Sequence, residues 1–246
     1  MEPIQIQFLG TGDARGSGGR LQTCIHVRSG EETLLIDCGA SSLIAMNRFG
    51  VDPSSVDRIL ISHLHGDHFG GIPFLILDGQ FARRTRPLLV AGPEGVEERV
   101  KASMKVFFPG SSKVERKFPL SFAELSPRRE TTLGSLQVTS FEGVHPSGSS
   151  SLALRIHLAG RTISYSGDTE WTESLLDAAR DADLFICEAY YFEKKIKYHL
   201  DYRTILGQLP RLGCRRIILT HMSQDLLSRL GEVRIDWAED GKKMVL

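Results

Sequence analysis

The chain has 246 residues and carries 30 basic and 30 acidic side chains, so its formal net charge is zero at pH 7. Dedicated nucleic-acid-binding proteins usually carry a basic excess, and this balance argues against that class. No apolar run approaches the ~18 residues that a membrane-spanning helix needs, so no membrane protein is expected. Sheet-rich domains routinely reach roughly 200 to 250 residues, and we expect residues 1–246 to form a single domain.

The N-terminus and the cysteines indicate a cytoplasmic protein. Met1 leads within three residues into an alternating strand at 4–8, which leaves no room for a signal peptide. The four cysteines lie far apart without a C-x-x-C pair, so neither a zinc ribbon nor a disulfide framework is indicated. They are Cys24, Cys38, Cys187 and Cys214.

The most informative segment is His63-Leu64-His65-Gly66-Asp67-His68, which follows a short apolar strand at 57–62. Residues i and i+2 of an extended chain project to the same side, so His63 and His65 can converge on one metal ion. Clustered His and Asp side chains are typical of Zn, Fe and Mn sites. The full H-x-H-x-D-H pattern after a buried strand therefore predicts a metal site.

Asp67 and His68 complete this segment. The glycines around them allow a sharp turn into a helix that we expect to start near Phe69. Such a turn can direct both side chains to a second metal ion beside the first. One loop can thus serve two ions.

Two ions need further ligands, and isolated His and Asp residues follow three other predicted strands. These are His145 after 136–141, Asp168 after 161–165 and His221 after 216–220. Each one alone is more simply read as a capping or hydrogen-bonded residue. Together with the His/Asp segment they predict a shared site, because proteins place reactive groups on loops held by rigid strands.

Helices are expected between these strands. The segment from Pro93 shows helical spacing of the apolar residues Val96, Val100, Met104 and Phe107, which we interpret as core residues. Two more helices are expected near 171–180 and 201–212. Strands followed by helices recur in both parts of the chain, and the first part ends near Leu125.

The order H-x-H-x-D-H, single His, S-G-D-T and L-T-H resembles the metallo-β-lactamase superfamily of dinuclear metal-dependent hydrolases. Glu188-Ala189 and His199-Leu200-Asp201 make the branch of ribonuclease Z and the cyclic-phosphate phosphodiesterases the nearest likeness. The resemblance implies an α/β fold, specifically an αββα four-layer sandwich of two mixed sheets.

The resemblance also implies the roles of the site residues. The first ion is held by His63, His65 and His145, the second by Asp67, His68 and His221, and Asp168 bridges them. The implied catalytic residues are His199 at the leaving oxygen, Glu188 supporting it, and Asp67. Two divalent ions are implied, with Zn as the first choice and Mn or Fe as alternatives.

Two departures separate the chain from the named subfamilies. Ribonuclease Z carries a long arm for transfer RNA between the single His and the bridging Asp, and residues 146–167 have no room for one. The phosphonate-pathway phosphodiesterases carry a cysteine-rich zinc site near the N-terminus, and residues 11–23 contain no cysteine. A carboxylate at His65 would indicate a flavin-linked di-iron oxidoreductase, and a cysteine at Asp168 a β-lactamase.

We therefore expect a metal-dependent phosphodiesterase that hydrolyses a small nucleotide, a cyclic phosphate or a short RNA through a metal-bridging hydroxide. The alternatives are a carboxyl-ester, lactone or thioester hydrolase of the same fold and a 3′-processing endonuclease for transfer RNA. A non-enzymatic binding module is disfavoured, because no ligand is lost. A homodimer is an expectation from the resemblance.

Four segments close in sequence to the candidate site residues each allow two interpretations. The basic runs 83–86 and 194–197 are either solvated surface or a rim for phosphate-bearing substrates. The serine turn 147–151 either bonds a phosphate or is a simple turn. The aromatic run 190–192 either stacks on a base or packs in the core.

Overall fold

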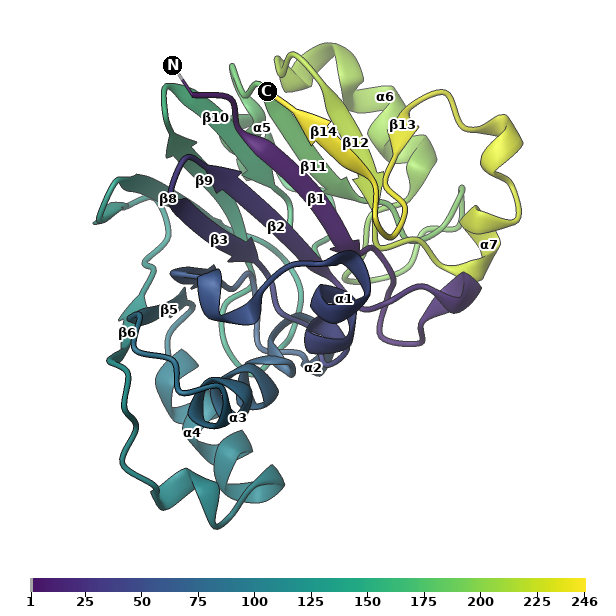
Figure 1. The fold of residues 1–246 in the computed structure, drawn as a ribbon. Helices are drawn as coiled ribbons and strands as arrows, with labels where there is room; N and C mark the ends of the chain where they lie inside the picture. Colours follow the sequence, from purple (N-terminus) through teal and green to yellow (C-terminus); the bar gives the residue numbers. More distant parts are fainter. Residues whose placement is uncertain (1) are drawn as a thin grey trace.

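The computed structural model describes residues 2–246, which form two mixed seven-stranded sheets (Figure 1). In spatial order, the first sheet contains β14 (Lys243–Val245), β1 (Gln5–Gly10), β2 (Cys24–Ser29), β3 (Glu32–Ile36), β4 (Arg58–Leu60), β5 (Leu88–Gly92) and β6 (Leu120–Glu124). The second contains β13 (Asp236–Trp237), β12 (Ile217–Thr220), β11 (Leu184–Glu188), β10 (Arg161–Tyr165), β9 (Leu152–Leu158), β8 (Leu136–Glu142) and β7 (Glu130–Leu133).

Both sheets follow the same pairing scheme. In the first sheet the β1–β2 and β2–β3 pairs are antiparallel and the β3–β4, β4–β5 and β5–β6 pairs are parallel. In the second, β8–β9 and β9–β10 are antiparallel, and β10–β11, β11–β12 and β12–β13 are parallel. The final strand β14 returns to pair with β1, which brings the two termini together (Figure 1).

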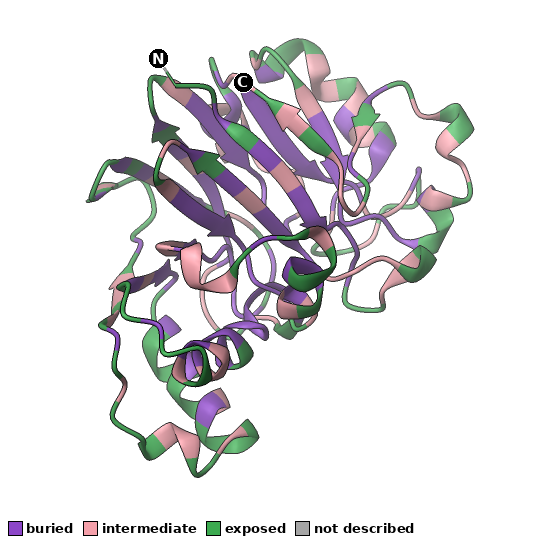
Figure 2. Ribbon diagram, viewed as in Figure 1, coloured by how far each residue is buried: buried purple, intermediate pink, exposed green. Residues whose placement is uncertain are grey.

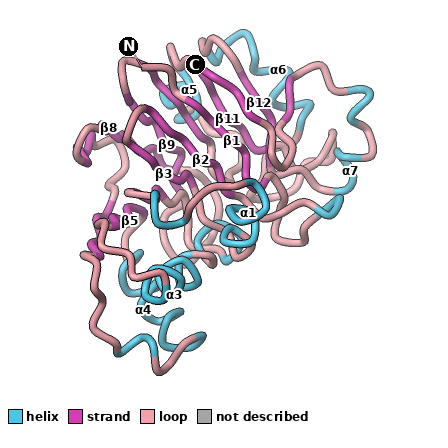
Figure 3. Tube along the Cα trace, viewed as in Figure 1, coloured by secondary structure: helices cyan, strands magenta, loops and turns pink. Residues whose placement is uncertain are grey.

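Helices cover the outer faces of both sheets (Figure 3). The α-helices are α1 (Ser42–Phe49), α2 (Gly66–Phe69), α3 (Ile72–Phe81), α4 (Val96–Phe107), α5 (Ser174–Ala179), α6 (Tyr202–Leu212) and α7 (Gln224–Leu227). Four 3₁₀ turns are η1 (Ser17–Gly19), η2 (Pro53–Ser55), η3 (Ser111–Lys113) and η4 (Leu230–Glu232). No helix within residues 2–246 is long and apolar enough to cross a membrane.

Three apolar clusters hold the four layers together (Figure 2). The central cluster lies between the sheets, and the other two join each sheet to its own helices. Strand β3 shows the consequence, because Leu34 and Ile36 enter the central cluster while Leu35 enters the cluster beneath α1 and α3. A strand covered on both faces reads as a continuous apolar run. The expected αββα sandwich of two mixed sheets is confirmed.

The predicted helix from Pro93 is α4. The prediction of a core position is correct for three of its four apolar residues and wrong for the fourth, Phe107. Val96, Val100 and Met104 are buried, whereas Phe107 is 50% exposed. The helix begins at Val96 because Gly95 adopts a left-handed conformation, with φ at 80°, as the N-cap. Phe107 instead lies beside the rings of Phe74 and Phe108.

Two arginines of the basic run 83–86 have structural roles, which favours neither solvated surface nor a substrate rim for them. Arg84 is only 4% exposed, and its guanidinium donates to the carbonyl oxygens of Arg86, Pro53, Val56 and Pro87 at 2.5 to 3.2 Å. Arg86 pairs with Asp57. Both cations are therefore engaged within the protein.

We expect Arg84→Lys to lower the free energy of unfolding by about 1–3 kcal/mol, because an ammonium cannot reach four carbonyl oxygens that a planar guanidinium satisfies together. Urea unfolding measures the change. The matched control is Arg83→Lys at the exposed neighbouring position, which we expect to change stability by less than about 0.5 kcal/mol. Equal effects of the two substitutions would contradict this role for Arg84.

Candidate metal centre

The loop after β4 carries four of the predicted ligands. His63 and His65 lie on extended chain before α2, and His65 has backbone angles of −84° and 150°. Asp67 and His68 lie within α2 itself, whose first residue is Gly66. The helix expected near Phe69 therefore begins three residues earlier, at Gly66. The second ligand pair, Asp67 and His68, lies on this helical turn.

The remaining ligands follow the carboxyl ends of three strands in the second sheet. His145 follows β8, Asp168 follows β10 and His221 follows β12. In mixed α/β sheets, ligands typically bind outside the carboxyl ends of parallel strands. His221 has a φ of 56°, a conformation that non-glycine residues seldom adopt and that concentrates at functional sites.

The structure brings all seven residues into two adjoining groups. In each group the candidate ligand atoms lie within 4.8 Å of one another. The first group is His63, His65 and His145, and the second is Asp67, His68, Asp168 and His221. His68 and His221 lie more than 150 residues apart in the sequence, yet their Nε2 atoms are 3.3 Å apart.

The spacing within the second group suits a metal ion. The Oδ2 atoms of Asp67 and Asp168 each lie 3.3 or 3.4 Å from the Nε2 atoms of His68 and His221. A tetrahedral ion with ligand bonds of about 2.0 to 2.1 Å separates its ligands by about 3.3 to 3.4 Å. The four donors are therefore arranged as the corners of one coordination sphere.

Asp168 lies between the two groups. Its Oδ2 atom is 3.9 Å from His63 Nε2 and 4.0 Å from His145 Nε2, in addition to its two contacts in the second group. A carboxylate is a hard oxygen donor that can bridge two divalent ions. The geometry fits the bridging role that the resemblance implies.

Unsatisfied polar atoms also indicate a missing ligand. His63 Nε2 and Asp168 Oδ1 are fully buried and have no hydrogen-bond partner in the protein. Buried polar atoms are otherwise almost always paired, since leaving one unpaired costs about 1–3 kcal/mol. A divalent cation would satisfy both atoms, so these residues fit a divalent metal ion.

Asp37 is an important residue that the sequence analysis did not single out. Its Oδ2 accepts a 2.6 Å bond from His68 Nδ1 and a 2.8 Å bond from Ser62 Oγ, and Ser62 Oγ lies 3.1 Å from His63 Nδ1. One buried carboxylate therefore fixes a histidine of each group, leaving both Nε2 atoms for metal. The signal in the sequence was the position of Asp37 after a strand, the same position that the other predicted ligands share.

The backbone of Tyr198 performs the same task for a third histidine. Its carbonyl oxygen accepts from His145 Nδ1 at 2.8 Å, which leaves His145 Nε2 for the metal. Tyr198 has a φ of 74°, so the chain adopts a strained conformation here. This contact also ties the first metal group to the segment that carries His199.

The charges in the site favour a cation. Burial disfavours the imidazolium of His221, but the Asp168 carboxylate and the bond to Asp67 raise its pKa to about 9. The pKa of His68 is likewise raised against the effect of burial by Asp168, Asp67 and Asp37. Carboxylates that stabilise the imidazolium forms of His68 and His221 also stabilise a divalent ion. Binding of that ion must displace the imidazolium protons.

His199 and Glu188 form a pair beside the second group. His199 Nδ1 lies 2.9 Å from Glu188 Oε2 and 3.8 Å from Asp168 Oδ2. Burial lowers the pKa of His199, yet the bond to Glu188 raises it overall, while burial and the Asp168 charge raise the pKa of Glu188. The pair therefore retains a proton, and Glu188, which also accepts from Thr169 N, is fixed in place.

The serine turn is a structural element. Ser151 Oγ donates to the carbonyl oxygen of Asp168 at 2.7 Å, and Ser149 Oγ donates to that of Glu94. Ser147 Oγ donates to the carbonyl oxygen of Ser149. Three hydroxyls are thus used to hold the loop around His145 and Asp168.

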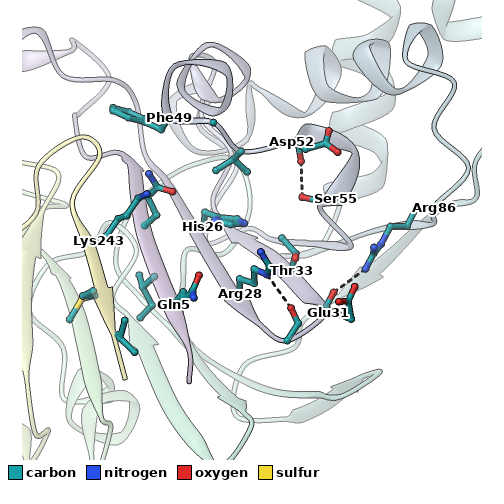
Figure 4. A pocket seen from close by; sticks show the side chains of 17 residues that line it. Gln5, His26, Arg28, Glu31, Thr33, Phe49, Asp52, Ser55, Arg86 and Lys243 are labelled. Atoms are coloured by element: carbon teal, nitrogen blue, oxygen red, sulfur yellow. Dashed lines mark hydrogen bonds between the residues drawn. The ribbon is translucent and has the colours of Figure 1, made fainter. Parts of the chain in front are cut away.

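A cavity of about 630 Å³ lies away from these ligands (Figure 4). It lies on the outer face of the first sheet, with His26 and Arg28 of β2 on one side and Phe49 and Asp52 on the other. None of the seven ligands lines it. The convergence of donor atoms, rather than cavity size, therefore identifies the candidate metal centre.

Comparison with known proteins gives matches over nearly the whole chain. Ribonuclease Z of Lachnoclostridium phytofermentans is 26% identical over 275 residues, covering 91% of this chain and 88% of that protein. Ribonuclease Z of Methanothermobacter thermautotrophicus is 29% identical over 270 residues, covering 89% and 87%.

Solved structures share the fold. The metallo-β-lactamase fold protein YhfI of Bacillus subtilis has a TM-score of 0.79 at 20% identity, with both chains fully covered. The short form of human tRNase Z has a TM-score of 0.80 at 23% identity, with 98% of each chain covered.

A family model described as anti-Pycsar protein Apyc1 matches residues 4–236. That range includes every candidate ligand and both members of the His199–Glu188 pair. The protein is thus a metal-dependent hydrolase of the metallo-β-lactamase superfamily, in the branch of ribonuclease Z and the phosphodiesterases, and it belongs to the anti-Pycsar protein Apyc1 family.

Proposed function

We propose that this protein is a dinuclear metal-dependent phosphodiesterase that hydrolyses a small nucleotide, a cyclic phosphate or a short RNA phosphodiester. The observation that carries the proposal is the position of Asp168 Oδ2, within 4.0 Å of imidazole nitrogens from both ligand groups. Relatives named ribonuclease Z support action on phosphodiesters. Residues 1–246 would form one catalytic domain.

The proposed ligand sets are those of the two groups, with Asp168 shared. Zinc is the proposed metal because imidazole and carboxylate donors at tetrahedral spacing suit it, and Mn and Fe are the alternatives. When bound, two such ions lower the pKa of a shared water to near ~7 and neutralise charge on the phosphate oxygens.

His199 is the proposed general acid. Its Nδ1 is engaged by Glu188 Oε2, so Nε2 is the atom available to donate a proton to the leaving oxygen. The side chain is 18% exposed, which allows contact with a substrate while Glu188 stays fully buried. Asp67, 3.3 Å from His221 Nε2, is proposed to act both as a ligand and as the acceptor that orients the attacking water.

Small substrates are favoured over transfer RNA. The alignments with the two ribonuclease Z relatives run over 275 and 270 positions, so those relatives carry insertions that a chain of 246 residues lacks. Strands β9 and β10 are joined only by the turn residues Ala159 and Gly160, both with positive φ. The exposed run 194–197 beside His199 is proposed to attract the substrate phosphate.

Ester, lactone and thioester hydrolysis use the same metal ligands and remain the second candidate. The buried Glu188 raises the pKa of His199, and a protonated His199 suits an ester with a basic leaving oxygen better than a thioester, whose thiolate needs no acid. The cytoplasmic location and the homodimer both stay predictions from the sequence.

Purified protein supplied with metal during growth is expected to contain about two transition-metal ions per chain. Asp168→Ala is expected to lose metal from both groups, and His157→Ala, at an exposed histidine of β9, is the control that keeps both ions. Elemental analysis measures the content. A wild-type protein holding one ion, with the same content in His221→Ala, would contradict two ions.

His199→Ala is expected to keep its metal but to lose roughly 10²- to 10⁴-fold in rate on a ribose ester, the range typical of a general acid. The loss on a p-nitrophenyl ester is expected to be much smaller, because that leaving group departs without a proton. Steady-state rates on 2′,3′-cyclic nucleotides and bis(p-nitrophenyl) phosphate test this. Equal losses on both esters would assign His199 a different role.

Cleavage of precursor transfer RNA is expected to be weak beside cleavage of small phosphodiesters, because the chain lacks an arm and a net positive charge. Both activities can be compared on one metal-loaded preparation, with human short-form tRNase Z as the positive control. Efficient cleavage at the 3′ side of the acceptor stem would restore the endonuclease alternative.

A further inference from the structure

Tyr190 lies directly against the proposed general acid. Its ring is stacked on that of His199, with centroids 4.5 Å apart and planes inclined by 22°. Two proposed metal ligands also adjoin His199: the ring of His145 meets it edge-on at 4.9 Å, and the ring of His221 is stacked on it at 5.9 Å with planes inclined by 15°. The imidazole of His199 is therefore enclosed by an aromatic face on one side and proposed metal ligands on others.

This contact is needed because one hydrogen bond does not fix a ring. The bond from Nδ1 to Glu188 Oε2 holds a single atom of His199 and leaves the ring free to tilt about it. A stacked ring restricts that tilt, because offset-stacked aromatic pairs have a preferred separation and inclination. The direction in which His199 Nε2 points is then set by Glu188 and Tyr190 together.

The backbone of Tyr190 is anchored independently of its side chain. Its amide donates to the carbonyl oxygen of Leu200 at 2.8 Å, next to His199. Its carbonyl oxygen accepts from the amide and the hydroxyl of Ser223, two residues after the ligand His221. A substitution of the side chain leaves these bonds in place, so the contribution of the ring can be measured separately.

The hydroxyl of Tyr190 stays protonated at neutral pH. Burial, followed by the nearby charge of Asp13, raises the pKa of Tyr190 to about 12. The stacked face is also occupied by His199, which leaves that face unavailable to a nucleotide base. Within the aromatic run 190–192, Phe192 packs in the core at 1% exposed, whereas Tyr190 is half-buried against His199.

We propose that Tyr190 is a positioning residue for the proposed phosphodiesterase reaction: its ring holds the plane of His199 so that Nε2 faces the leaving oxygen. The inference rests on the proposed function for the role of His199, but the orientation of the ring is a separate physical claim. The ring face carries the effect, and the hydroxyl is dispensable.

The experiment uses zinc-loaded Tyr190→Leu and Tyr190→Phe, with Tyr191→Leu as the matched control, because Tyr191 meets Tyr190 only edge-on at 5.0 Å. Crystal structures of the variants are compared first. We expect His199 to keep one orientation in Tyr190→Phe and Tyr191→Leu and to take more than one in Tyr190→Leu. A single unchanged orientation in Tyr190→Leu overturns the proposal, whether or not the protein is a phosphodiesterase.

Rates on the two esters provide the second measurement. Tyr190→Leu is expected to lose about tenfold or more in kcat on a 2′,3′-cyclic nucleotide and at most about threefold on bis(p-nitrophenyl) phosphate, because only the former needs the acid. Tyr190→Phe is expected to stay within about twofold of wild type on both. Metal content should be unchanged in each variant.

The double variant separates a positioning effect from a general disturbance. If Tyr190 acts through His199, adding Tyr190→Leu to His199→Ala causes no further loss on the cyclic nucleotide. A further tenfold loss in that background, or equal losses of Tyr190→Leu on both esters, overturns the proposal. Absence of activity in wild type would instead contradict the proposed function and leave the crystallographic result to decide the orientation.

Discussion

The site depends on one buried carboxylate. Asp168 Oδ2 lies 3.4 to 4.0 Å from the Nε2 atoms of four histidines on three different loops, and the residue is 2% exposed. An isolated carboxylate at this depth would be strongly destabilised. Bound cations would offset that cost, as the neighbouring imidazolium groups of His68 and His221 do without metal.

The fold brings these residues together by repeating one sheet scheme twice. Each sheet places parallel strands so that their carboxyl ends meet at the same edge, and the two edges adjoin. A main-chain bond from Leu152 to Ser62 ties the second sheet to the loop before His63. Backbone strain at Asp37 and His221 is tolerated because the cores on both sides of each sheet hold the flanking strands.

Around the candidate ligands, a second set of contacts sets the orientation of the histidine rings. Asp37 fixes a histidine of each group, the Tyr198 carbonyl fixes His145, and Glu188 holds His199. Each donor's free nitrogen is thereby directed inward. Precise orientation of this kind distinguishes a catalytic metal site from a merely metal-stabilised fold.

The sequence by itself indicated the candidate donor residues and the class of fold. His63 and His65 could be paired because their spacing is a local property of extended chain, and Asp168 and His221 were marked by the strands they follow. Only the tertiary structure showed that Arg84 serves carbonyl oxygens, that Phe107 is exposed and that Tyr190 lies against His199. Those outcomes depend on contacts between segments far apart in the chain, and the packing of the layers, which no local pattern encodes, decides which segments meet.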